Sequence, residues 1–335
     1  MKWLDLRSDT VTLPSAAMRA CALDVALGDD VFGEDATVNA LQKRCSEELG
    51  FESGLFVPSG TQSNLLALMA HCERGDEYIV GSEAHTYKFE GGGAAVLGSI
   101  QPQPVPQQQD GTLDLAAISA AIKPIGDPHF ACTTCLTLEN TWWGRVLPQN
   151  YIAEASVLAK HHNLAFHLDG ARLYNAAIAQ NIHAREIAKS FDSVSICFSK
   201  GLGAPVGSML LGTEELISKA RRWRKVLGGG WRQAGVLAAM ANFALDHNIE
   251  RLADDHRRAS ELAHALADVS HIEVNGAFTN MVFITLPKER LAALSTHMKA
   301  YSINLSASNP KIRLVMHLDI DDAGLTRIIE AFKTF

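Results

Sequence analysis

Residues 195–203, Ser-Ile-Cys-Phe-Ser-Lys-Gly-Leu-Gly, decide how the rest of the chain is interpreted. The segment begins like a buried strand, and Lys200 follows at once, immediately before a glycine. An ammonium group is rarely buried, because its desolvation is costly unless it is paired or gives up its proton. Lys200 therefore lies in water just beyond a strand or provides an amine for chemistry. Taken by itself, the solvated position is the simpler interpretation.

Short apolar runs recur along the chain and alternate with stretches of helical periodicity. This alternation is typical of a mostly parallel sheet covered by helices, so we predict an α/β fold. Residues 101–111, QPQPVPQQQDG, are predicted to form a polar loop. The candidate strands are residues 55–59, 77–81, 135–140, 164–170, 194–199 and 207–212, and the candidate helices are residues 61–72 and 151–162.

The pattern changes near residue 249. A long charged helix is predicted over residues 250–269, and short strands with a helix between them are predicted over residues 272–275, 281–286 and 312–317. We therefore predict two domains. Residues 1–248 form a large domain that includes an N-terminal arm, and residues 249–335 form a smaller C-terminal α/β domain.

The composition favours a globular enzyme with small-molecule ligands. The chain has 335 residues, of which 47% are hydrophobic, which is enough for a sizeable core. Its 30 Lys and Arg against 37 Asp and Glu give a net charge of -7, so nothing attracts it to nucleic acid or to an anionic membrane. We expect a small-molecule substrate and other protein subunits as partners.

The N-terminal sequence and the cysteines indicate the cellular compartment. The opening MKWLDLRSDTVTLP lacks the apolar core of a secretory signal, and the apolar residues 234–245 are too short to cross a bilayer. We therefore expect a cytoplasmic protein with reduced thiols. Cys132 and Cys135 form a CxxC, but no second pair completes a zinc site, so we predict a buried strand and no metal. The basic run 219–225 is predicted to be a solvated or inter-subunit helix face.

Polar residues follow directly on two further strands, at the edge where doubly wound sheets bind ligands. Ser59, Gly60 and Thr61 would open a helix whose amides can hold a phosphate, although Ser is also a common helix cap. Asp169 could accept a hydrogen bond from a protonated ring nitrogen, and Arg172 could hold a carboxylate; an ordinary Asp-Arg ion pair is the alternative.

Together with Lys200, these segments specify one ligand. A phosphate cradle, a carboxylate for a pyridinium nitrogen and a lysine for an aldehyde are the groups that bind pyridoxal phosphate. The sequence therefore predicts a pyridoxal-phosphate site.

The chain also resembles a known family. The motifs LDLRSDTVT, VPSGTQSN, GSEAHTYKFEGGGAAVLGSI, LENT, HLDGAR, SKGLGAPVGSML, RRWRKVLGGGWRQAG and IRLVMHLD look, in this order and over nearly the whole chain, like those of the low-specificity L-threonine aldolases. The resemblance implies the aspartate-aminotransferase type of fold (fold type I) and a homotetramer built as a dimer of dimers. It also implies reversible cleavage of L-threonine or L-allo-threonine to glycine and acetaldehyde.

The resemblance further implies roles for individual residues, position by position. Lys200 would bond to the cofactor aldehyde, Asp169 would pair with the ring nitrogen, and His85 would stack on the ring. Gly60 and Thr61 would bind the phosphate, and Arg232 would reach the phosphate or a neighbouring subunit's site. Ser8, Arg172 and Arg313 would bind the substrate carboxylate. His129 would lie near the substrate hydroxyl. His85, His129 or a water between them are the candidate bases for the hydroxyl proton.

The chain departs from the family pattern at a few positions. Trp142 and Trp143 replace the usual His-Asn, so they either alter the substrate entrance or pack at a subunit contact; packing or a modest change of specificity is favoured. Trp231 and Met316 also differ from the common residues. A beta-eliminating lyase or aminotransferase on the same fold stays open as an alternative. A non-enzymatic relative would be expected to lose Lys200 or the arginines, which are present.

Overall fold

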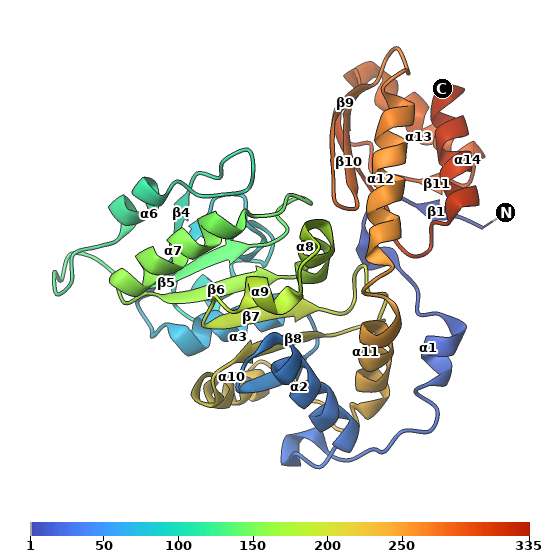
Figure 1. Cartoon of the computed structure of the whole chain (residues 1–335). Helices are drawn as coiled ribbons and strands as arrows, with labels where there is room; N and C mark the ends of the chain where they lie inside the picture. The colour runs from blue at the N-terminus through green and yellow to red at the C-terminus, as the bar shows by residue number, and fades with distance from the viewer. Residues whose placement is uncertain (1) are drawn as a thin grey trace.

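The computed structural model describes residues 2–335, which form two units joined side by side (Figure 1). The large unit is built on a seven-stranded sheet in the order β2-β8-β7-β6-β5-β3-β4. β8 is antiparallel to both of its neighbours, and the other strands share one direction, so the sheet is mostly parallel, as predicted. The strands are β2 (Ser53–Val57), β3 (Asp76–Gly81), β4 (Gln101–Val105), β5 (Cys132–Glu139), β6 (Ala165–Gly170), β7 (Ser193–Cys197) and β8 (Ser208–Gly212).

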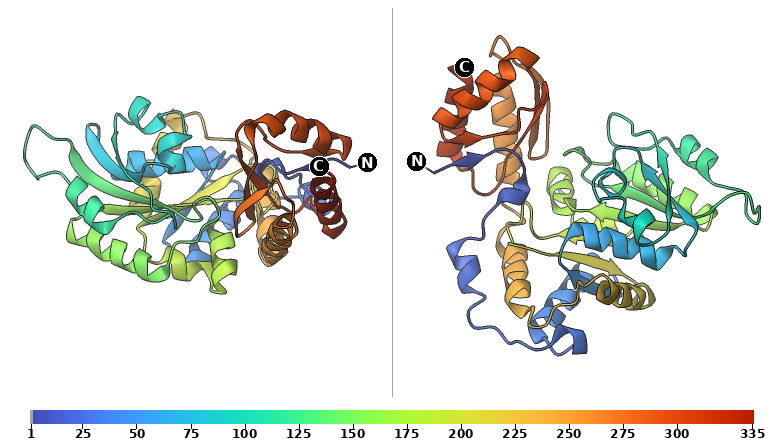
Figure 2. Two further views of the ribbon diagram at one scale, coloured as in Figure 1. Left: turned by 90° about the horizontal axis from the view of Figure 1, so that it is seen from above. Right: turned by 180° about the vertical axis from the view of Figure 1, so that it is seen from behind.

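Helices cover both faces of this sheet, which is why its central strands β7 and β8 are buried along their whole length. One face packs against α2 (Ala36–Leu49), α7 (Gln149–His161), α8 (Leu173–Gln180), α9 (Ala184–Ala188) and α11 (Gly235–His247), which share one hydrophobic core. The other face packs against α3 (Gly60–His71), α5 (Gly93–Val96) and α10 (Glu214–Val226). Figure 2 shows these two helical layers from above and from behind.

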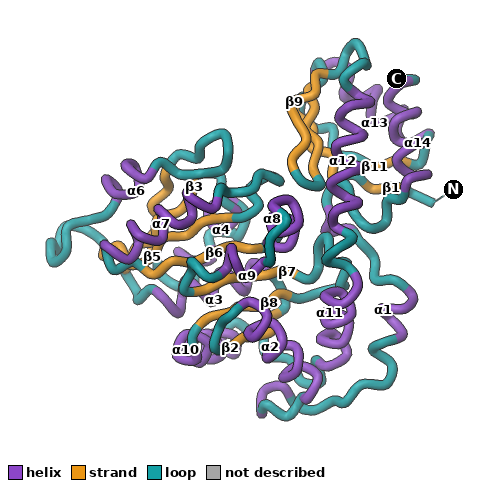
Figure 3. Tube along the Cα trace, viewed as in Figure 1, coloured by secondary structure: helices purple, strands orange, loops and turns teal. Residues whose placement is uncertain are grey.

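The smaller unit has its own sheet and its own core. Strands β9 (Glu273–Phe278), β10 (Met281–Thr285) and β12 (Lys311–Val315) form an antiparallel sheet, against which α12 (Leu252–Leu266) packs together with α13 (Leu291–Ala300) and α14 (Asp322–Lys333) (Figure 3). The N-terminal strand β1 (Leu4–Asp5) pairs with β11 (Ile303–Asn304). Leu4 and Leu6 therefore belong to the core of the small unit. The division of the chain at residues 248 and 249 stays a proposal.

The N-terminal segment then crosses from the small unit to the large one. After β1 it forms two short helical turns, η1 (Asp9–Val11) and α1 (Ala16–Ala20), and reaches a third turn, η2 (Asp30–Phe32), before α2. Thr12 donates a hydrogen bond to the backbone oxygen of Lys200, 3.0 Å away. This contact fixes the arm beside the loop that follows β7.

One local prediction was wrong, and a second was wrong at a single residue. Residues 101–105 form the edge strand β4 rather than a loop. Pro102 and Pro104 alternate along it, and an edge strand tolerates this because only one side has to pair with β3. On α10, Arg224 is buried instead of solvated, because it pairs with Asp30 at 2.7 Å and donates to the backbone oxygen of Phe56.

The remaining short helices are α4 (His85–Lys88), α6 (Leu115–Ala121) and η3 (Lys288–Arg290). Within residues 2–335, no helix is both long and apolar enough to span a bilayer. The six cysteines are free thiols; Cys135 is buried in β5 and Cys132 is exposed at its start.

Candidate active site

A cavity of about 460 Å³ opens where the carboxyl edge of the large sheet faces the small unit. The edge lies there because the parallel strands all end on the same side, and the loops after β3, β5, β6 and β7 supply much of its lining. The cavity brings together five of the residues singled out from the sequence, namely Ser8, His85, Arg172, Lys200 and Arg313. Lys200 is partly buried rather than fully solvated.

Asp169 lies at the end of β6, beside this cavity, and is 3% exposed. One carboxylate oxygen accepts a hydrogen bond from the side-chain amide of Asn64 at 3.0 Å, and the other accepts from the backbone N–H of Ala171 at 3.1 Å. These two donors fix the orientation of the carboxylate of Asp169. The sequence indicated Asp169 but not Asn64.

His85 begins α4 after β3 and lines the cavity with a side chain that is 41% exposed. Its Nδ1 lies 2.8 Å from a carboxylate oxygen of Glu90, whose side chain is only 5% exposed. The hydrogen bond to Glu90 raises the pKa of His85 above its usual value. Suitable ligand atoms of His85, Glu90 and Asp169 lie within 4.8 Å of one another. Such a trio can also hold a metal ion, so the expected absence of a metal site stays a prediction.

Glu139, at the end of β5, is a further carboxylate of the cavity that the sequence analysis did not single out. It accepts a hydrogen bond from the backbone N–H of His85 at 2.7 Å. Burial, with the nearby charge of Asp169, raises the pKa of Glu139 to about 7. A carboxyl group that titrates near neutral pH and lines a cavity is a candidate functional group. The motif LENT contained it, but an acidic residue at a strand end has no distinctive spacing.

Arg172 lines the cavity with part of its guanidinium already paired, and its role in holding the substrate carboxylate stays a prediction. Its guanidinium donates from Nε and Nη2 to the two carboxylate oxygens of Asp9, at 2.8 and 2.6 Å. Burial alone would raise the pKa of Asp9, but the charge of Arg172 holds it well below its usual range. Asp9 is fully buried and was not singled out from the sequence. Arg172 is therefore in an ion pair within the cavity wall, but its partner is Asp9 and not Asp169, the partner considered from the sequence.

The predicted phosphate cradle lies at the start of α3. Ser59 is the N-terminal cap of the helix, and its hydroxyl accepts from the backbone N–H of Gln62 at 3.1 Å. Gly60 faces the hydroxyl of Ser208, which is buried and has no hydrogen-bond partner within residues 2–335. Thr61 is exposed in the first turn. An unpartnered buried hydroxyl beside free helix amides is a suitable place for an anion.

Two predicted residues lie elsewhere in this chain. His129 precedes β5, so it lies at the amino edge of the sheet, whereas the cavity is at the carboxyl edge; its side chain is 83% exposed and pairs with Asp127. Figure 1 shows this loop, between α6 and β5, on the side away from the small unit. His129 therefore lies apart from the cavity of its own chain, and its assigned position near the substrate stays a prediction. Arg232 is 56% exposed and pairs with Asp29 at 3.0 Å, outside the cavity.

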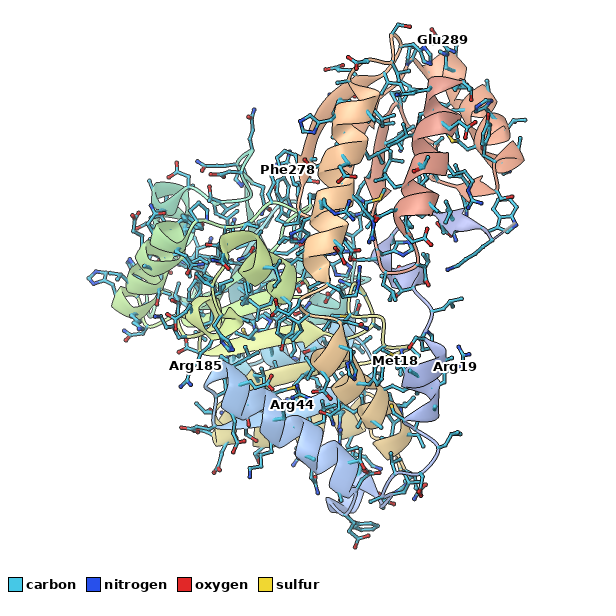
Figure 4. All side chains as sticks on the ribbon, turned by 45° about the vertical axis from the view of Figure 1, so that its right-hand side comes forward. Met18, Arg19, Arg44, Arg185, Phe278 and Glu289 are labelled. Carbon is cyan, nitrogen blue, oxygen red and sulfur yellow. The ribbon has the colours of Figure 1, made fainter. Side chains whose placement is uncertain are left out.

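Of the two tryptophans that replace the usual His-Asn, one lines the cavity and the other lies outside it. Trp143 lines the cavity, and the guanidinium carbon of Arg313 lies 5.3 Å from the centre of its ring. Trp142 lies outside the cavity, near Arg145, whose guanidinium carbon also stacks over Phe278 at 3.8 Å. Figure 4 labels Phe278 where the small unit meets the large one.

The other two departures lie outside the cavity lining. Trp231 packs on Phe56, with ring centres 5.3 Å apart, and Met316 is buried in the core of the small unit. Of the unusual aromatic residues, Trp143 is therefore the one that can contact a substrate.

Comparison with known proteins gives consistent results over the whole chain. Residues 5–289 match the beta-eliminating lyase family. The low specificity L-threonine aldolase of Escherichia coli is 50% identical over 332 residues, which cover 99% of both chains. The probable low-specificity L-threonine aldolase 2 of Arabidopsis thaliana is 41% identical over 344 aligned residues, which cover 99% of this chain and 97% of the plant protein.

Solved structures share the fold at low sequence identity. A putative L-allo-threonine aldolase from Listeria monocytogenes superimposes with a TM-score of 0.82 at 20% identity, covering 99% of this chain and 96% of that one. The threonine aldolase of Leishmania major superimposes with a TM-score of 0.84 at 20% identity, and the match covers 99% of each chain. The fold predicted from the sequence is thereby confirmed.

Proposed function

The chain belongs to the low-specificity L-threonine aldolases within the beta-eliminating lyase family, and on this premise we propose that it cleaves L-threonine and L-allo-threonine reversibly to glycine and acetaldehyde with pyridoxal phosphate. Other L-β-hydroxy-α-amino acids are the wider substrate class. The observation that carries this proposal is the cavity in which Lys200, His85 and Arg313 meet beside the buried Asp169.

The residues around the cavity fit the cofactor. Asp169 offers a buried carboxylate for a protonated ring nitrogen, and the unpartnered hydroxyl of Ser208 faces Gly60 at the start of α3, where a phosphate fits. Lys200 lines the cavity and would hold the cofactor aldehyde. When bound, pyridoxal phosphate withdraws electrons from the α-carbon of the amino acid and so weakens the bond to the β-carbon.

The chain's own side chains divide the remaining tasks. Arg313 and Ser8 line the cavity beside Lys200 and would bind the substrate carboxylate. Arg172, which keeps its pair with Asp9, lines the same cavity and would add its positive charge to the binding of that carboxylate. His85 would stack on the cofactor ring and accept the proton of the β-hydroxyl in its neutral form, with Glu139 fixing its backbone.

The proposal extends to assembly and location. We propose a homotetramer, a dimer of dimers, in the cytoplasm. Arg232 is exposed and lies outside the cavity of its own chain, which supports a role at a neighbouring subunit's phosphate. Light scattering of the purified protein measures the mass; a mass of one chain would contradict the assembly.

The direct test is product analysis. Purified protein loaded with pyridoxal phosphate is given L-threonine and L-allo-threonine separately, and glycine, acetaldehyde, ammonia and keto acid are measured. Equal amounts of glycine and acetaldehyde are expected. Release of a keto acid and ammonia instead would favour the alternative, a beta-eliminating lyase.

A further inference from the structure

A chain of buried polar side chains runs from Asp169 away from the cavity, and the proposed reaction does not use it. Asn64 on α3 contacts Asp169, His167 lies 3.2 Å from Asn64, and Ser193 lies 2.8 Å from His167. His71, in the last turn of α3, lies 2.7 Å from the hydroxyl of Ser193. Asn64, His167 and Ser193 are at most 1% exposed.

The fold places these groups together for simple geometric reasons. His167 and Asp169 are two residues apart on β6, so their side chains point to the same face of the sheet. Ser193 is the partner of His167 in the parallel register of β6 and β7. α3 packs on these strands, and Asn64 and His71, seven residues apart, lie on the same side of the helix.

The two carboxylates fix the orientation of the Asn64 amide. Its Nδ2 lies 2.9 Å from a carboxylate oxygen of Glu90 and 3.0 Å from one of Asp169. A carboxylate accepts hydrogen bonds, so the NH₂ group must face both acids and donate one hydrogen to each. The amide oxygen of Asn64 therefore faces His167 and accepts its Nε2–H.

The orientation of Asn64 then assigns every following proton. With the proton of His167 on Nε2, its Nδ1 accepts the hydroxyl hydrogen of Ser193, whose oxygen in turn accepts Nε2–H of His71. Burial lowers the pKa of His167 to about 3 and that of His71 to about 4, so both rings are neutral, as this arrangement requires. Every donor in the chain points toward Asp169.

We propose that Asn64, His167 and Ser193 are positioning residues that hold the carboxylate of Asp169 aimed at the ring nitrogen of the cofactor. Donors aligned in one direction polarise one another, so the bond that reaches the carboxylate is stronger than an isolated one. Asp169 needs this support because it is buried and because Glu90 and Glu139 lie close enough for their charges to interact with it. The inference rests on the proposed cofactor site, not on the identity of the amino acid substrate.

The test uses cofactor binding and spectroscopy rather than turnover. Apoprotein is prepared from the holoenzyme of each variant, and the dissociation constant of pyridoxal phosphate is measured by fluorescence titration. The absorbance of the rebound cofactor is then followed against pH. Asn64→Leu, which removes both N–H donors at similar size, is expected to weaken binding about tenfold or more and to lower the pH at which the bound ring deprotonates.

Two further comparisons keep the test independent of folding. His167→Phe keeps the ring shape but donates no hydrogen bond, whereas His167→Gln can present an amide N–H to Asn64, so Gln is expected to recover much of the binding that Phe loses. Ser193→Ala is expected to have a smaller effect of the same sign, since it is one step further from Asp169. The matched control is Ser63→Ala, because Ser63 is equally buried on α3 and its hydroxyl has no partner within residues 2–335.

Unchanged dissociation constants and an unchanged pH titration in the His167 and Ser193 variants, whether or not their melting temperatures fall, would overturn the inference. Such a result would make the chain an ordinary polar core. The outcome is separable from the proposed function: a wild-type protein that binds the cofactor but cleaves neither threonine would contradict the aldolase proposal and leave this one standing.

Discussion

Arg172 and Asp9 form a two-pronged ion pair in the cavity wall, with N–O distances of 2.8 and 2.6 Å. Asp9 comes from the N-terminal arm and Arg172 from the loop after β6, so the pair ties the arm to the catalytic edge of the large sheet. Its carboxylate is fully buried, and the arginine side chain is 12% exposed. The pair is therefore structural as well as adjacent to the substrate.

Removing Asp9 should destabilise the protein and disturb substrate binding together. Asp9→Ala leaves a buried guanidinium without its partner, so we expect the free energy of unfolding to fall by about 3 kcal/mol. The Michaelis constant for L-threonine should rise more than kcat falls. The control is Glu186→Ala, which breaks the exposed pair with Lys189 and should leave the free energy of unfolding almost unchanged. Equal losses in the two variants, measured by denaturant unfolding, would contradict this role.

Trp143 should matter for the substrate and Trp142 should not. The stack of Trp143 against Arg313 is worth about 1 kcal/mol, so Trp143→Ala is expected to raise the Michaelis constant for L-threonine about fivefold with little change in kcat. Trp142→Ala is the matched control, because that ring lies outside the cavity. Steady-state kinetics decide the point, and equal effects at the two positions would show that the rings only pack.

Glu139 should make the cofactor-free protein less stable as the pH rises. Its folded-state pKa of about 7 lies above the ordinary 4.5, so its favourable contribution is complete below pH 4.5 and is lost as the pH rises through 7. Glu139→Gln keeps an oxygen for the backbone N–H of His85 but removes the titration. The gap between variant and wild type, measured by urea unfolding of apoprotein, should grow from pH 4.5 to 7. A constant gap would argue against the raised pKa.

The two candidate histidines should behave differently. His85 lines the cavity and His129 lies at the opposite edge of the sheet. His85→Ala is expected to lower kcat for L-threonine at least tenfold, whereas His129→Ala should stay within about twofold of the wild type. A large loss of kcat in the His129 variant would mean that the residue reaches a cavity in a neighbouring subunit.

Much of the candidate site was predictable because its residues lie at or just beyond the ends of strands. Asp169 lies at the end of β6, Ser59 and Lys200 lie just after β2 and β7, and strands that run in one direction bring such residues to one edge of the sheet. Asn64 and Glu90 carried no signal, since a polar residue inside a helix or after a loop looks like any other. Their role depends on which strands α3 covers, and that is a property of the three-dimensional packing.

What the sequence analysis missed has equally physical causes. The role of His129 near the substrate was assigned by resemblance and stays a prediction; in its own chain the residue precedes β5, at the amino edge of the sheet. The sequence analysis did not single out Asp9 in the motif LDLRSDTVT, because Asp9 becomes buried only where the N-terminal arm meets Arg172. β4 was taken for a loop because its prolines are excluded from central strands but not from edges.

Lys200 is the residue expected to hold the cofactor, and chemical reduction of the bound cofactor tests this bond. Holoenzyme is reduced with borohydride to make the bond between lysine and cofactor permanent, then digested, and the peptides are analysed by mass spectrometry. We predict the pyridoxyl mass on the peptide containing Lys200 and on none in the Lys200→Ala variant. A modification on another lysine, or none in the wild type under conditions where pyridoxal phosphate is bound, would contradict the account.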